Sequence, residues 1–112
     1  MENVIEIKSF NFAIRIVNLR KYLTKKKEHI LSKQLLRSGT SIGANVAEAE
    51  QAQSTADFIS KMNIALKETS ETKYWLRLLK ETEYISDNEF QSIFNDCVEI
   101  EKILVSIIKS SK

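Results

Sequence analysis

Residues 34–48 read QLLRSGTSIGANVAE, and this stretch decides how the chain folds. Gly39 and Gly43 lie four residues apart in it, surrounded by small and polar side chains. Glycine inside a helix costs about 1 kcal/mol relative to alanine. Because the apolar residues around the glycines recur at helical spacing, we expect a helix that another backbone or side chain approaches closely at these two positions.

Apolar residues also recur with the helical period in three other parts of the chain. The 112 residues include only two glycines and no proline, a composition that suits sheets and hairpins poorly. The predicted helices run from about Glu6 to Leu23, from Glu28 to Glu50, from Ser54 to Glu83 and from Ser86 to near the C-terminus. Their short connections favour antiparallel neighbours. The sequence therefore predicts one all-α domain over residues 1–112, an antiparallel up-down-up-down four-helix bundle.

Local signals mark several helix boundaries. Ser86 and Glu89 form a capping box, and Ser54 with Asp57 resembles one in which Asp replaces Glu. The lysine-rich turn 24–28 ends the first helix, with cations placed favourably at a helix C-terminus. The predicted core stripes of the last three helices are Leu31, Leu35, Ile42 and Val46; Phe58, Met62, Ala65, Thr69, Leu76 and Leu79; and Phe90, Ile93, Phe94, Cys97, Leu104 and Ile108.

Two helices carry more apolar surface than one bundle needs. The first has two displaced stripes, one of Phe10, Ala13, Ile14 and Val17, the other of Phe12, Ile16, Leu19 and Leu23. The third has three apolar residues away from its main stripe, namely Ile64, Trp75 and Leu78. A second apolar face on a small protein indicates a protein partner, most commonly another copy. We therefore predict a homo-oligomer with Ile64, Trp75 and Leu78 at or near the contact.

Charge is unevenly distributed along the chain, although the net charge is only +2. Residues 1–40 hold nine Lys and Arg against three Glu, whereas residues 41–112 hold eight against twelve acidic residues. The basic side chains of the first two predicted helices and their connection include Arg15, Arg20, Lys21, Lys25, Lys26, Lys27, Lys33 and Arg37. One interpretation is a solvated surface, and the other is a face that contacts nucleic-acid phosphates with residues 25–27 at its tip.

Four polar residues form a seam along the second predicted helix: Ser38, Ser41, Asn45 and Glu48. Their spacing places them on or beside its buried face. A buried Asn needs a hydrogen-bond partner, because an unpaired polar group destabilises the fold. We expect a polar network that fixes the helix register, with a ligand site as the alternative.

Residues that could carry catalysis are few. His29 is the only histidine, so one chain cannot form a two-histidine metal site. The nearest preceding arginine, Arg20, lies nine residues before His29, so the Arg-to-His spacing of helical-bundle ribonucleases is missing. Cys97 lies on an apolar helix face and is predicted to be a buried, inert thiol. We expect no enzymatic activity, no metal and no cofactor.

The sequence also bears on where the protein acts. No apolar run approaches the roughly 18–20 residues of a membrane span. The N-terminal residues MENVIEIKSF lack the basic region and apolar block of a secretory signal. With one cysteine, an intrachain disulfide is impossible. We therefore expect a cytoplasmic protein without a membrane segment.

Residues 34–48 also carry a family resemblance. Residues 34–38 and 41–48 resemble the pattern Gln-Leu-Arg-Arg-Ala followed by Ser-Ile-x-x-Asn-Ile-Ala-Glu-Gly, found in a four-helix bundle protein family whose founding members are encoded by intervening sequences of bacterial 23S ribosomal RNA genes. Residues 58–71 resemble the third helix of that family. Leu36 stands where the pattern has the first of two arginines, and Ala49 where it has glycine.

The resemblance implies a cytosolic bacterial protein that assembles as a ring, commonly a pentamer. The family is similar to the accessory variability protein of diversity-generating retroelements, a basic pentameric barrel that binds nucleic acid and a reverse transcriptase. Our first hypothesis is a non-enzymatic oligomeric module that binds RNA or a ribonucleoprotein through its basic face. The alternative is a protein-binding scaffold with no nucleic-acid role. A third hypothesis, an RNA-processing enzyme, lacks a supporting acid–base pair.

Overall fold

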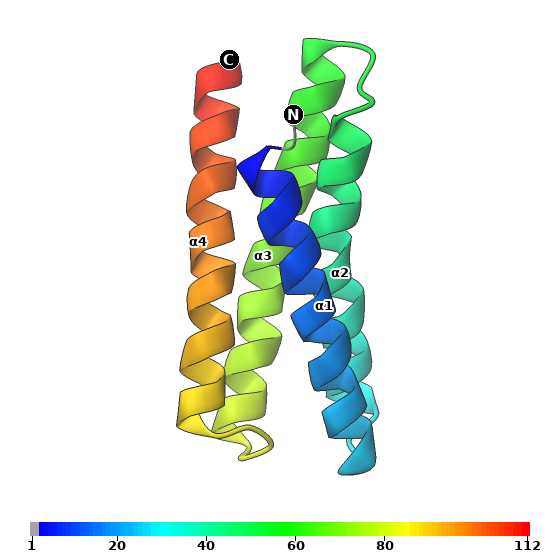
Figure 1. The fold of residues 1–112 in the computed structure, drawn as a ribbon, viewed down its shortest axis with the longest axis vertical. Helices are drawn as coiled ribbons and strands as arrows, with labels where there is room; N and C mark the ends of the chain where they lie inside the picture. The colour runs from blue at the N-terminus through cyan, green and yellow to red at the C-terminus, as the bar shows by residue number, and fades with distance from the viewer. Residues whose placement is uncertain (1–2) are drawn as a thin grey trace.

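The computed structural model describes residues 3–112, which form the helices α1 (Val4–Lys25), α2 (Ile30–Ala49), α3 (Thr55–Glu81) and α4 (Asp87–Ser111). They pack into an elongated bundle of 44 × 23 × 19 Å, in which successive helices run in opposite directions (Figure 1). α1 contacts α2 and α4, and α3 contacts the same two helices, so α1 and α3 lie at opposite corners. The predicted four-helix bundle is confirmed, and the described residues contain no strand.

Short polar side chains start α3 and α4 as predicted. The Ser54 hydroxyl accepts a hydrogen bond from the backbone N–H of Asp57 at 3.1 Å. At α4, the Ser86 hydroxyl accepts from the N–H of Glu89, and the Glu89 carboxylate accepts from the N–H of Ser86, both at 3.1 Å. This reciprocal pair is the predicted capping box, and it satisfies two backbone donors that have no partner inside the helix.

α2 begins at Ile30, two residues later than predicted. Glu28 precedes the helix, and its buried carboxylate accepts hydrogen bonds from the backbone N–H groups of Leu31 at 2.9 Å and Ser32 at 2.7 Å. Burial raises the pKa of Glu28, but these N–H groups and the Ser32 hydroxyl outweigh it, so the pKa is lowered overall. Glu28 is therefore a capping residue that precedes the helix instead of forming its first turn.

α1 and α3 end in the same way, and both ends lie at the same end of the bundle (Figure 1). Lys27 and Glu83 follow them in the left-handed conformation, with φ of 64° and 67°. After α1, the N–H of Lys27 donates to the carbonyl of Thr24 and the N–H of Glu28 to that of Leu23. The corresponding bonds follow α3, so each helix closes with a Schellman motif. α1 ends at Lys25, two residues beyond its predicted end. α3 ends at Glu81, two residues short of its predicted end.

The core runs along the inner faces of all four helices. The predicted stripes of α2, α3 and α4 are buried except at Leu31, Phe58 and Phe94, which are half-buried and pack against the core. In α1, the stripe that contains Phe12 faces inward, whereas the stripe that contains Phe10 faces solvent. The core also includes Ala49, which completes the stripe of α2, and Ile5, Ile85 and Ile100, which lie outside the predicted stripes.

The two glycines lie where α1 crosses α2. A Cβ atom on Gly39 would lie 2.7 Å from Cγ1 of Ile16, which is fully buried. A Cβ atom on Gly43 would lie 3.2 Å from the backbone oxygen of Ser9. The close approach predicted from the sequence is confirmed, and α1 is the element that approaches. Gly39 thus lets α1 and α2 approach more closely than a Cβ atom at this position would permit, and Gly43 leaves room for only a tight contact.

On its other side, α1 meets α4 less extensively, and ion pairs mark this contact. The ammonium of Lys8 lies 2.8 Å from the Glu99 carboxylate. The guanidinium of Arg15 lies 2.6 Å from the carboxylate of Asp96 and also donates to the Ser92 hydroxyl at 3.0 Å. Exposed pairs of this kind contribute little stability, so α1 is held mainly by its packing on α2.

Candidate functional site

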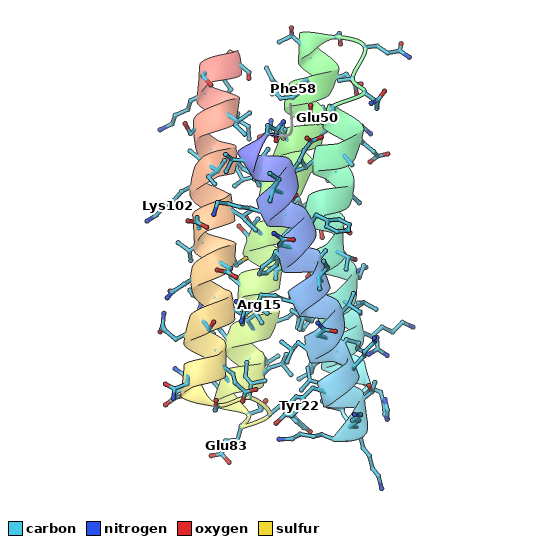
Figure 2. The ribbon with its side chains drawn as sticks, in the orientation of Figure 1. Arg15, Tyr22, Glu50, Phe58, Glu83 and Lys102 are labelled. Atoms are coloured by element: carbon cyan, nitrogen blue, oxygen red, sulfur yellow. The ribbon has the colours of Figure 1, made fainter. Side chains whose placement is uncertain are left out.

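The eight basic residues singled out from the sequence separate into two groups. Arg15 and Arg37 lie along the sides of the bundle in ion pairs, Arg15 with Asp96 and Arg37 with Glu68 and Glu71 (Figure 2 labels Arg15). Their charges are therefore matched by acidic side chains of the same chain. Arg15 and Arg37 contribute little to any field that could attract nucleic acid.

The other six gather where α1 joins α2, and are termed the basic end: Arg20, Lys21, Lys25, Lys26, Lys27 and Lys33. All five lysines are exposed, and Arg20 is half-buried. Lys26 places its ammonium 4.7 Å from the centre of the Tyr22 ring. None of the six forms an ion pair with another residue of the described part of the chain. The structure therefore brings together six of the predicted nucleic-acid contacts as a cluster of uncompensated cations.

An acidic cluster lies at the same end of the bundle, where α3 joins α4. This acidic turn consists of Glu81, Glu83, Asp87 and Glu89, all of them exposed. A shallow groove between the two turns is lined by residues of both, among them Tyr22, Lys26 and Glu83 (Figure 2 labels Tyr22 and Glu83). This end of the bundle is therefore dipolar, with cations over α1 and α2 and anions over α3 and α4.

The predicted polar seam divides between the core and the surface. Ser38 is buried, and its hydroxyl accepts a hydrogen bond from the Thr72 hydroxyl of α3 at 3.0 Å. Ser41 and Asn45 donate to carbonyls of their own helix at 2.6 and 2.8 Å. Glu48 is exposed. Of these four residues only Ser38 thus joins two helices. Its partner Thr72 was missed, although its spacing from Thr69 and Leu76 places it on the same buried stripe of α3.

The predicted contact residues on α3 lie on its outer side. Ile64 is 40% exposed, and Trp75 and Leu78 are half-buried. The Trp75 indole donates to the Glu71 carboxylate at 3.0 Å. Its ring packs edge-on against Tyr74, at 5.0 Å between ring centres, and Tyr74 is 57% exposed. We term Ile64, Tyr74, Trp75 and Leu78 the α3 patch.

A larger uncovered apolar surface lies on α1. Four residues on one side of this helix are 36–66% exposed and are termed the α1 stripe: Ile7, Phe10, Ile14 and Val17. Beside Phe10, a groove of about 470 Å³ descends to Gly43 and Ala47 of α2. The sequence identified most of these residues as a stripe but did not place it at a contact, because either stripe of α1 could have faced the core.

Reactive side chains do not come together. His29 is exposed and makes no side-chain hydrogen bond at the start of α2. Burial, reinforced by the nearby Glu101 and Asp96 carboxylates, raises the pKa of the Cys97 thiol to about 12. Within residues 3–112, no three His, Cys, Asp or Glu side chains are grouped to hold a metal ion. No helix in that range is long and apolar enough to cross a membrane.

Comparisons with known proteins concern all four helices. The model of a family described as 23S rRNA-intervening sequence protein matches residues 1–106. A crystal structure of a protein with unknown function from the S23 ribosomal protein family of Bacteroides thetaiotaomicron VPI-5482 is 64% identical in sequence and superimposes with a TM-score of 0.93. The similarity covers 95% of this chain and 99% of that one. No curated protein matches the chain.

Proposed function

The chain belongs to the family of 23S rRNA-intervening sequence proteins, and on this premise we propose that it is a non-enzymatic, oligomeric module that binds RNA or a ribonucleoprotein through its basic end. The observation that carries the proposal is the cluster of six cations without acidic partners. The module would act in the cytoplasm, where a single buried thiol such as Cys97 stays reduced.

The arrangement of the basic end suits contacts with phosphates rather than with bases. Lys25, Lys26 and Lys27 are exposed on a turn, and flexible lysines act as point charges. Lys26 lies over the Tyr22 ring, so the exposed aromatic side chain that the structure describes at the basic end is already engaged and is poorly placed for base stacking. We therefore expect binding to structured RNA with little sequence preference.

Self-assembly would strengthen this binding. The acidic turn reduces the field of one copy, because its four carboxylates lie at the same end of the bundle. Repeating the basic end around an axis would present several clusters to one RNA and raise the overall affinity without new contacts. By resemblance to its family, the assembly would be a pentamer.

The test is fluorescence anisotropy with a labelled RNA hairpin at low and moderate salt. We expect binding that weakens steeply with salt, because each neutralised phosphate releases counterions. Replacing Lys25, Lys26 and Lys27 together by alanine should weaken binding and flatten its dependence on salt. The matched control removes three exposed lysines elsewhere, Lys67, Lys102 and Lys109. An equal loss of RNA affinity in both variants, or no RNA binding at low salt, would contradict the proposed RNA contact.

The second candidate function is a protein-binding scaffold with no nucleic-acid role. The exposed α1 stripe favours it, because contiguous apolar surface on a folded protein commonly marks a protein contact. The same anisotropy experiment separates the two functions. An assembled protein that does not bind RNA at low salt would act through its protein contacts alone.

A further inference from the structure

A further groove lies between α1 and α4, the two helices of the bundle whose contact is limited. They diverge towards the end of the bundle where α1 joins α2 (Figure 1). The groove has a volume of about 560 Å³, within the range of about 300–1,000 Å³ that is typical of small-ligand sites. Arg15 and Tyr22 of α1 line its two ends (Figure 2). We term it the α1–α4 groove.

The floor of the α1–α4 groove is apolar. Ile85 and Ile93 are buried, and Leu19 is half-buried and packs against the core. Covering such a floor with a flat ring is favourable, because apolar surface leaves water. A phosphate on the same floor would lose its hydration without gaining a partner. The floor therefore suits the ring of a ligand and not its charged groups.

Free amide groups stand on both walls of the groove. Asn18 of α1 and Asn88 of α4 line it and are exposed. Within residues 3–112, the asparagine side chains that form hydrogen bonds are those of Asn3, Asn45 and Asn95. The amides of Asn18 and Asn88 thus keep their donors and acceptors for a ligand. An asparagine amide pairs with the edge of adenine through two hydrogen bonds.

Glu89 restricts which base suits the groove. Its carboxylate lines the groove, and one of its oxygens accepts the capping hydrogen bond from the N–H of Ser86 at 3.1 Å. A carboxylate has further lone pairs, which can accept from an amino group of a base. The same carboxylate repels the carbonyl oxygens of uracil. The groove therefore favours a base that carries an exocyclic amino group.

The α1–α4 groove opens beside the basic end. It shares Tyr22 and Glu89 with the shallow groove between the two turns, which Lys26 also lines. The lysines of the basic end lie on the α1 side, and the carboxylates of the acidic turn lie on the α4 side. An RNA strand held by the lysines is thus directed over α1, since the acidic turn repels its phosphates. A base that points away from that strand faces α4 across the groove.

We propose that the α1–α4 groove holds one unpaired base of the bound RNA, a base with an exocyclic amino group such as adenine. The ring covers the apolar floor, and its edge pairs with the two asparagines and Glu89. Bases inside a duplex are stacked, so the RNA must offer a bulged or looped-out nucleotide. This inference rests on the proposed function and deepens it. The basic end contacts phosphates, and the groove adds one position at which the RNA is unpaired.

Three labelled RNA duplexes test the inference by fluorescence anisotropy. Each consists of two annealed strands, so that no hairpin loop supplies unpaired bases. One is fully paired, one has a single bulged adenosine, and one has an abasic residue at the bulge. The adenine bulge should bind about fivefold or more tightly than the abasic bulge, because a bidentate pair discriminates by at least that factor. The abasic duplex has the same bulged backbone, so equal affinities would overturn the inference.

A bulged uridine tests the preference for an amino group. It should bind no more tightly than the abasic bulge, because uracil lacks that group. Equal affinity for the adenine and uracil bulges would contradict the predicted pairing with Glu89 and the asparagines. Adenosine monophosphate alone should bind much more weakly than the adenine bulge, since it lacks the neighbouring phosphates. If it bound equally well, a free nucleotide would be the ligand and the assignment to RNA would be wrong.

A double variant tests whether the base occupies this groove. Asn18→Leu with Asn88→Leu should abolish the preference for the adenine bulge and leave the affinity for the paired duplex unchanged. The matched control, Asn11→Leu with Asn63→Leu, changes two exposed asparagines outside the groove and should keep the preference. Far-ultraviolet spectra check that both variants keep their helix content. A preference that persists in the first variant would place the base elsewhere and overturn the inference.

Salt separates this inference from the proposed function. The affinity for every duplex should fall as salt rises, whereas the ratio between the adenine and abasic bulges should stay constant, because the base contacts release no counterions. Salt-dependent binding of the paired duplex without any gain from the adenine bulge would overturn this inference and leave the proposed function intact. Absence of RNA binding at low salt would overturn both.

Discussion

Ile16 of α1 packs directly on Gly39 of α2, and a Cβ atom on Gly39 would lie only 2.7 Å from Ile16 Cγ1. Two other carbons of the same isoleucine would lie within 3.0 Å of it. Ile16 is fully buried and has no room to move away. The missing methyl group of one residue therefore sets how closely two helices approach.

Gly39→Ala should consequently lower stability, by about 1–3 kcal/mol, because overpacking outweighs the gain in helix propensity. Gly43→Ala should cost less, since its nearest neighbour would be at 3.2 Å. Urea unfolding curves of the two variants and wild type measure both effects. A higher unfolding midpoint for Gly39→Ala would show that propensity alone governs this position.

The Glu28 carboxylate should make stability depend on pH. Its pKa in the folded protein lies below its ordinary value of 4.5, so it stabilises the fold above that pH. This stabilisation is lost as the pH falls through the lower folded pKa. Glu28→Gln should cost about 1 kcal/mol at pH 7, as expected for a helix-capping group, and nothing once wild-type Glu28 is protonated. Thermal unfolding of both proteins from pH 7 to acid checks this, with the exposed Glu48→Gln as a control.

The Ser38–Thr72 hydrogen bond should couple α2 to α3. Thr72→Val leaves the buried Ser38 hydroxyl without its partner from α3, at a cost of about 1–2 kcal/mol. Ser38→Ala should cost less in the Thr72→Val background than in wild type, because there it removes a hydroxyl that keeps only its long bond to the Leu35 carbonyl. A double-mutant cycle in urea measures the coupling. Additive losses would mean that the two hydroxyls stabilise the bundle independently.

The left-handed residues that close α1 and α3 should accept glycine with a gain. Lys27→Gly and Glu83→Gly each relieve the steric cost of a side chain at positive φ, and each should raise stability by about 0.5–1 kcal/mol. Lys25→Gly, two positions earlier and inside α1, should instead lower it by about 1 kcal/mol. Differential scanning calorimetry ranks the thermal stabilities of the three variants. A loss at Lys27→Gly would mean that its side chain contributes more than its backbone strain removes.

Whether a feature could be predicted from the sequence depended on how far apart along the chain its interacting residues lie. The start of α4 was predictable, because the residues of its capping box, Ser86 and Glu89, are three positions apart. The start of α2 was not, because Glu28 caps it from outside through a long side chain. Which stripe of α1 is buried depends on the crossing at Gly39, which periodicity cannot specify.

The basic face shows the same limit. The sequence did not distinguish the eight cations from one another. In the structure, the Arg15 guanidinium pairs with the carboxylate of Asp96, which is 81 positions away. Pairings over such distances arise only once the helices are packed. The cluster of cations at the α1–α2 turn could be predicted, because its members lie close together in the sequence.

The limited contact between α1 and α4 has a consequence for local unfolding. α1 and α4 each have only one extensive neighbour, so these two helices should detach from the bundle more readily than α2 and α3, and the outer side of α1 is bare as well. The amide protons of α1 should therefore exchange with solvent sooner than those of α2 and α3. A second copy seated on the α1 stripe would cover that outer side and slow the exchange. The exchange rates of α1, measured at increasing protein concentration, should therefore report assembly residue by residue, while the amides of α3 that face the core stay unchanged.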